Sequence, residues 1–155
     1  MKVDESVIIR PLLAGDLDKV VKLDEQAFGD DAWPRDWFEE IADHSDFKVY
    51  VAEIGRAETL TIAGYCALQV KDGYGEVATI GVGKSFRRAG LGRKMMSVLA
   101  DTARTSGLSL IRLRLRTDNA HARKLYESLG FTTTGIERGY YESDGTDAEI
   151  MTIDL

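Results

Sequence analysis

The fold of this chain is decided by the segment Thr79-Ile-Gly-Val-Gly-Lys-Ser-Phe-Arg-Arg-Ala-Gly-Leu-Gly-Arg93. Its first residues predict a strand that runs into a loop, and the loop opens a helix. Gly90 and Gly92 let the backbone turn tightly and keep side chains away from it. The first amides of the helix point outward without partners, and their dipole favours an anion such as a pyrophosphate.

Three arginines, Arg87, Arg88 and Arg93, add positive charge beside this loop. The loop is not a Walker loop, because no Gly-Lys-Ser/Thr follows the glycines, and it lacks the third glycine of the dinucleotide fingerprint. An ordinary glycine-containing helix start with solvated arginines fits the segment equally well. The segment alone therefore leaves a phosphate site and a plain helix start open.

The length and charge of the chain limit the classes of protein it can be. Its 155 residues predict one domain, residues 1–155, and 44% of them are hydrophobic, which suffices for an ordinary core. The net charge of -6 argues against nucleic acid as the main partner, since binding a duplex needs a basic face. The same charge is compatible with a cationic acceptor.

The few cysteine and histidine residues and the lack of long apolar runs argue against a disulfide-linked protein, a metal site and a membrane protein. Cys66 is the one cysteine, so no internal disulfide can form, and its apolar neighbours indicate a buried side chain rather than a nucleophile. His44 and His121 show no metal-ligand spacing, and no metal is implied. No apolar run is long enough for a signal peptide or a membrane span, so a cytoplasmic location without a membrane partner is expected.

On both sides of residues 79–93, hydrophobic periodicity predicts further elements, and the full order is β-α-α-β-β-β-α-β-α-β-β. Asp16 is a candidate N-cap of the first helix, and Trp37, Phe38 and Ile41 fall on one side of the second. This order predicts an α/β sheet with both parallel and antiparallel neighbours. The expected strands cover residues 6–11, 47–54, 59–71, 75–82, 110–116, 131–141 and 148–155. The first expected helix runs from the residue after Asp16 to residue 28, and the other three cover residues 35–44, 90–105 and 119–129.

Three sets of residues, in order and spacing, resemble one known family. The run Arg87-Arg-Ala-Gly-Leu-Gly92 resembles the Arg/Gln-x-x-Gly-x-Gly/Ala signature of GNAT acetyltransferases. The runs Leu115-Arg-Thr-Asp-Asn119 and Lys124-Leu-Tyr-Glu-Ser-Leu-Gly-Phe131 resemble the second family signature. Arg138-Gly-Tyr-Tyr141 with Asp147-Ala-Glu-Ile-Met151 resembles the tail of the RimI-like branch, which acetylates protein N-termini.

The resemblance implies a fold, a cofactor and the residues that contact it. The fold would be the GNAT fold, a mixed, mostly antiparallel twisted sheet of about seven strands flanked by about four helices. The cofactor would be acetyl-CoA, with its pantetheine arm along residues 80–82, its pyrophosphate on the amides of 88–93, and its sulfur near Tyr126. The implied contact residues are Ile80, Gly81, Val82, Arg87, Arg88, Ala89, Gly90, Leu91, Gly92, Arg93, Asn119 and Tyr126.

In this family the amine attacks the thioester directly, without a covalent enzyme intermediate. The resemblance implies Tyr126 as the acid for the leaving thiolate and a backbone N–H near Val82 for the oxyanion. RimI-like enzymes carry a glutamate base five residues before the asparagine, where this chain has Arg114, which cannot be a base near neutral pH. Glu76 is the substitute candidate, although a solvated carboxylate at a strand start fits it as well. Asp30 and Asp31 are weaker candidates.

The acceptor is expected between the first interhelical loop and the segment before the last strand. The residues expected to bind it are Phe28, Arg114, Arg138, Tyr140 and Tyr141. Three functions remain open: acetylation of a protein N-terminus, such as that of a ribosomal protein with N-terminal alanine; acetylation of a small amine, such as a polyamine, an amino acid or an antibiotic; and acyl-CoA binding without catalysis. The choice between monomer and homodimer stays open.

Overall fold

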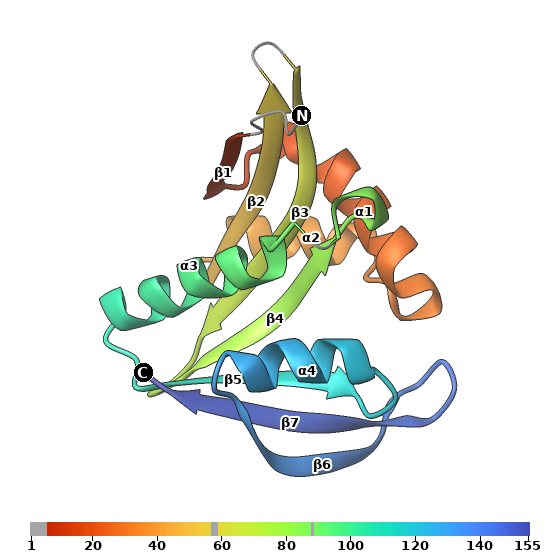
Figure 1. The fold of residues 1–155 in the computed structure, drawn as a ribbon, viewed down its shortest axis with the longest axis vertical. Helices are drawn as coiled ribbons and strands as arrows, with labels where there is room; N and C mark the ends of the chain where they lie inside the picture. Colours follow the sequence, from red (N-terminus) through yellow and green to blue (C-terminus); the bar gives the residue numbers. More distant parts are fainter. Residues whose placement is uncertain (1–5, 57–58, 88) are drawn as a thin grey trace.

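A sheet of seven strands in the order β1-β2-β3-β4-β5-β7-β6 runs through the part of the chain that the structure describes (Figure 1). The structure, a computed structural model, describes residues 6–56, 59–87 and 89–155. The strands are β1 (Ser6–Pro11), β2 (Phe47–Arg56), β3 (Thr59–Val70), β4 (Gly75–Val82), β5 (Leu110–Arg116), β6 (Thr132–Tyr141) and β7 (Thr146–Asp154). The helices are α1 (Leu17–Phe28), α2 (Arg35–Asp43), α3 (Leu91–Thr105) and α4 (Ala120–Ser128), with short 3₁₀ turns η1 (Ala14–Asp16), η2 (Gly29–Asp31) and η3 (Lys84–Phe86).

The mixed α/β architecture predicted from periodicity is confirmed, and the element ends differ by at most two residues. Asp16 holds the predicted N-cap position of α1, but its side chain makes no capping hydrogen bond: its carboxylate accepts the Leu13 N–H and pairs with Arg10. On the second helix, Phe38 is buried whereas Trp37 is half exposed.

Helices cover both faces of the sheet. Helices α1 and α2 pack on one face, where Val20 and Phe38 form one buried cluster with Tyr65 of β3, and the Phe38 ring packs edge-on against Tyr65. Helices α3 and α4 pack on the other face, where Met95 and Leu99 of α3 belong to one buried cluster with residues of β3, β4 and β5. None of the helices in the described ranges has the length and apolar character needed to cross a bilayer.

Two adjacent strands, β4 and β5, separate almost as soon as they meet. They run parallel and pair only at Gly75–Ile111 and Glu76–Arg112. On its other side β4 pairs with β3 along most of its length, but the register shifts so that Ala78 has no partner between Val77 and Thr79. A bulge of this kind bends and twists a strand. The ends of β4 and β5 therefore diverge, as Figure 1 shows, and leave the later part of β4 without a neighbour on that side.

Below the diverging part of β4 lies a buried polar pair. Tyr65 of β3 is 1% exposed, and its hydroxyl donates to the carboxylate of Asp24 on α1, which is also buried. Burial raises the pKa of Asp24, while the Tyr65 hydroxyl and the Trp33 N–H stabilise its charged form. The ring of Tyr65 packs so closely under Gly81 that a Cβ there would lie 2.3 Å from the hydroxyl oxygen.

Cys66 is fully buried, as its apolar neighbours indicated. Burial raises the pKa of its thiol to about 12. Because the thiolate is the nucleophilic form, this side chain packs as a small apolar residue rather than reacting.

The contact between Tyr65 and Gly81 generates a stability prediction. Gly81→Ala should lower the free energy of unfolding by about 1 to 3 kcal/mol, because the added methyl group overpacks a buried site. Gly15→Ala is the control, since a Cβ at Gly15 meets nothing within 4 Å, and it should stay within about 0.5 kcal/mol of the parent. Urea unfolding of the three proteins measures both effects, and equal midpoints would contradict the close packing.

Candidate active site

The gap between β4 and β5 opens into a cleft of about 1270 Å³. Its lining comes from β4, β5, the start of α3, and α4 on one side, and from α1, η2, α2 and the β6–β7 hairpin on the other. Segments as far apart in the chain as Asp24 and Asp144 therefore line one continuous cleft that passes through the sheet.

One half of the cleft is built around the start of α3. Gly90 precedes this helix with φ of 76°, a left-handed conformation that glycine adopts without strain. The amides that follow have no partner in the preceding turn and face an anion favourably. Arg88 lies outside the described residues, and Ala89 is not among those that line the cleft. The other residues assigned to the cofactor all line it: Ile80, Gly81, Val82, Arg87, Gly90, Leu91, Gly92, Arg93, Asn119 and Tyr126.

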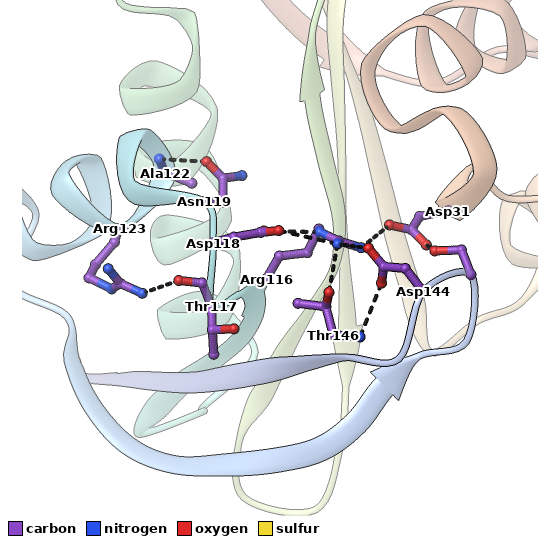
Figure 2. Close-up of polar contacts among 10 residues, drawn as sticks. Asp31, Arg116, Thr117, Asp118, Asn119, Ala122, Arg123, Asp144 and Thr146 are labelled. Atoms are coloured by element: carbon purple, nitrogen blue, oxygen red, sulfur yellow. Dashed lines mark hydrogen bonds and ion pairs between the residues drawn. The ribbon is translucent and has the colours of Figure 1, made fainter.

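Helix α4 brings Asn119 and Tyr126 to the same half. Asn119 is the N-cap of α4, and its side-chain oxygen accepts the Ala122 N–H at 3.1 Å (Figure 2). Tyr126, on the inner side of this helix, is 8% exposed and packs edge-on against Phe131. Burial raises the pKa of the Tyr126 phenol to about 12, so it carries its proton at any ordinary pH.

The other half of the cleft has an aromatic mouth. Phe28 at the end of α1 and Tyr140 and Tyr141 at the end of β6 line it, and Tyr140 packs edge-on against Tyr141. Arg138 does not join them: its side chain is 85% exposed and pairs with Asp147 of β7. Of the five residues expected at the acceptor, the structure thus brings four to the cleft, Arg114 being the fourth.

Glu76 lies between two arginines of β5. Its carboxylate accepts from Arg112 Nε at 2.7 Å and from Arg114 Nη1, and its residue is 6% exposed. Arg114 Nε is also 3.3 Å from the carboxylate of Glu137 on β6, and its guanidinium lies over the Tyr140 ring. Glu76 is therefore not the solvated carboxylate that its strand-start position also allowed, and Arg114 already has two carboxylate partners.

Sequence reasoning missed two groups at this site. Asp24 lines the cleft, and the signal was available, because Asp24 follows Val20 by one helical turn on the buried stripe of α1. Arg116 binds three carboxylates, from η2, the β5–α4 loop and the β6–β7 hairpin (Figure 2). Arg116 alternates with the buried residues of β5, but its partners lie too far along the chain for any local pattern to reveal them.

Comparison with known proteins gives the family. Residues 17–131 match the acetyltransferase (GNAT) family. The chain belongs to this family. The GNAT fold expected from the signature motifs is thereby confirmed, together with the acetyl-CoA dependence of the family's N-acetyltransferase reaction.

Proteins similar to this chain include two that are named as N-acetyltransferases. The N-alpha-acetyltransferase RimI of Mycobacterium tuberculosis is 34% identical over 154 residues, which cover 95% of this chain and 92% of that protein. An uncharacterized Mycobacterium leprae protein is also 34% identical, but the chain spans only 41% of its length. The crystal structure of the ribosomal-protein-S18-alanine N-acetyltransferase from Escherichia coli superposes with a TM-score of 0.83 at 28% identity, covering 97% of this chain and 94% of that one.

The residues of this GNAT chain fit acetyl-CoA. Between β4 and β5 no pairing continues beyond Glu76 and Arg112 in the described residues, so backbone groups of residues 80–82 remain available to an extended arm. The cradle at Gly90 suits the pyrophosphate, and the cleft of about 1270 Å³ is large enough for an elongated cofactor and an acceptor together.

The position of Glu76 generates a second stability prediction. Glu76→Gln should lower the free energy of unfolding by about 1 to 3 kcal/mol, because two guanidiniums then lose the charge that balances them at a buried site. Asp18→Asn is the control: Asp18 also pairs with an arginine, Arg35, but its side chain is 86% exposed, and its loss should not be measurable. A Glu76→Gln protein as stable as the parent in urea unfolding would show that the pairing contributes nothing.

Proposed function

We propose that this enzyme transfers the acetyl group of acetyl-CoA to the α-amine of a protein N-terminus. The observation that carries the proposal is the continuity of the cleft from the start of α3, through the gap between β4 and β5, to the aromatic mouth of Phe28, Tyr140 and Tyr141. A chain end can enter such a mouth with its terminal amine first, while the rest of the peptide stays outside. The names of the RimI relatives support a protein acceptor.

In the proposed mechanism, Tyr126 supplies a proton at its Oη. When bound, acetyl-CoA supplies an activated thioester, and the amine attacks it without a covalent enzyme intermediate. Backbone N–H groups of β4 near Val82 stabilise the negative charge that develops on the carbonyl oxygen. Burial keeps the Tyr126 phenol protonated, so its Oη has a proton to donate to the departing sulfur.

Glu76 is the proposed base that accepts the proton of the attacking ammonium. It is buried and lines the cleft, and the two arginines fix its orientation. Both carboxylate oxygens already accept from guanidiniums, so the proton reaches Glu76 through a water or after one of these contacts opens. The pH profile decides the role: Glu76→Gln should lose the rise in rate with increasing pH, and a profile matching the parent would remove Glu76 from the mechanism.

A small amine is the second candidate acceptor, because Arg114 stands where RimI-like enzymes have their glutamate. The contacts of Arg114 weaken one form of this alternative. Its Nη1 donates to Glu76, and its Nε lies 3.3 Å from the Glu137 carboxylate without a hydrogen bond, so its positive charge is already balanced and attracts an acidic acceptor weakly. Neutral or cationic small amines remain competitors in the experiment.

The decisive experiment offers acetyl-CoA with a panel of peptides and small amines. The panel holds peptides with a free N-terminal alanine, the same peptides with a blocked N-terminus and an internal lysine, and polyamines. Mass spectrometry of the products locates the acetyl group. We expect it on the free α-amine and not on the blocked peptides, whereas transfer only to lysine side chains or to polyamines would refute the proposal.

The role of Tyr126 generates a prediction of its own. Tyr126→Phe should lower kcat by about 100-fold or more, because the leaving sulfur loses its proton donor. The matched control is Tyr50→Phe, which removes another partly buried hydroxyl, bonded to Thr102 away from the cleft, and should keep the parent rate. Since the pKa of Tyr126 is about 12, its titration should cause no fall in kcat between about pH 8 and about pH 10. A Tyr126→Phe enzyme with the parent kcat would exclude this role.

A further inference from the structure

One guanidinium joins the two walls of the acceptor mouth. Arg116 Nη1 donates to Asp31 of η2 at 2.7 Å, and Nη2 donates to Asp144 of the β6–β7 hairpin and to Thr146 Oγ1 at 2.9 Å (Figure 2). Its Nε donates to Asp118 of the β5–α4 loop at 3.1 Å. Asp31 lies 85 residues from Arg116 along the chain, and Asp144 lies 28 residues from it. Arg116 therefore connects segments that are remote in the sequence.

We infer that Arg116 is a positioning residue that sets the width of the acceptor mouth by tying the α1–α2 loop to the β6–β7 hairpin. We call Arg116, Asp31 and Asp144 the mouth clamp. The inference rests on the proposed function for the identity of the acceptor, but the tie itself can be measured without any acceptor.

The segments joined by the clamp carry the aromatic walls. Asp31 follows Phe28 by three residues, and Asp144 follows Tyr141 by three, and all four residues line the cleft. The guanidinium of Arg116 also lies over the Tyr141 ring, 5.0 Å from its centre. A second contact, from Ser143 Oγ to Asp31, joins the same two walls directly. Movement of either wall would therefore change the space in which an acceptor amine is held.

Backbone hydrogen bonds alone hold these walls weakly. The ladder between β6 and β7 pairs Glu137 with Ala148 and next pairs Tyr141 with Thr146, so residues 138–140 fall in an irregular stretch. On the other wall, η2 is a single 3₁₀ turn closed by the Ala32 N–H on the Gly29 carbonyl. The side-chain contacts that Arg116 of β5 makes therefore add substantially to the few backbone contacts that hold the two walls.

The charge balance indicates positioning rather than direct binding. Arg116 faces three carboxylates, so it has no uncompensated charge to attract an anionic acceptor. Its hydrogen bond lowers the pKa of Asp144 to about 2, which keeps that partner ionised at any pH suitable for an assay. A planar guanidinium can reach several carboxylates in different directions, whereas a lysine ammonium cannot match that geometry.

The test uses the full chain with the acceptor peptide that the panel identifies. Arg116→Met should raise the acceptor KM about 10-fold to 100-fold, because a displaced wall loses contacts with the bound acceptor, while the Kd for coenzyme A changes less than about twofold. Arg116→Lys should fall between the parent and Arg116→Met. Amide hydrogen exchange should increase in residues 29–33 and 141–146 of Arg116→Met and not in α3.

Two carboxylate variants supply the matched comparison. Asp144→Asn removes a clamp contact and should raise the acceptor KM. Asp118→Asn removes a carboxylate from the same guanidinium, but Asp118 belongs to the segment that follows β5 and joins neither wall, so KM should stay within about twofold. If Arg116→Met fails to fold, Arg116→Lys and Asp144→Asn carry the test.

The outcomes separate the clamp from the proposed function. A parent enzyme that acetylates no peptide refutes the proposed function, while hydrogen exchange still decides whether Arg116 holds the walls. An active parent with an unchanged KM and unchanged exchange in Arg116→Met overturns the clamp. An equal rise of KM in Asp118→Asn and Asp144→Asn also overturns the clamp. The rise in KM would then result from the lost negative charge beside Arg116 and not from a broken contact between the walls.

Discussion

β4 and β5 pair through two residues each before the bulge at Ala78 turns β4 away, and the whole cleft depends on this divergence. A parallel pair that continued would satisfy the backbone groups of β4 and close the sheet. The interruption leaves a polar strand edge inside the molecule, which a bound extended chain can complete. The start of α3 and the side chains of α4 then lie on one side of the gap, and the aromatic mouth lies on the other.

Strand β5 serves both sides of this arrangement. Its apolar residues, among them Leu113, pack under α3 and α4, while its arginines line the opposite face. Each arginine is balanced by carboxylates from other elements and covered by a tyrosine ring: Arg112 by Tyr74, Arg114 by Tyr140 and Arg116 by Tyr141. Balanced in this way, a row of like charges can lie beside the active site without repelling the cationic amine that must approach it.

Most of the fold could be predicted from the sequence because it follows from local patterns. Ile111, Leu113 and Leu115 alternate with arginines, a local pattern that is typical of a strand with one buried face, and Gly90 indicated the start of α3. The family signature assigned the cofactor half of the cleft, since those residues are close together in the chain and act largely through the backbone. The half exposure of Trp37 and the contacts of the Asp16 carboxylate could not be predicted, because helical spacing alone does not show which neighbour a side chain will find.

The element order, the family and the residues expected to contact acetyl-CoA could be read from the amino-acid sequence, because each depends on spacing within a short segment. The surroundings of the charged groups depend on the folded chain. Folding joined Glu76 to two arginines, buried Asp24 against Tyr65, and linked Arg116 to carboxylates on separate segments. Such contacts depend on how distant segments approach one another in space, and local sequence patterns do not predict these long-range distances.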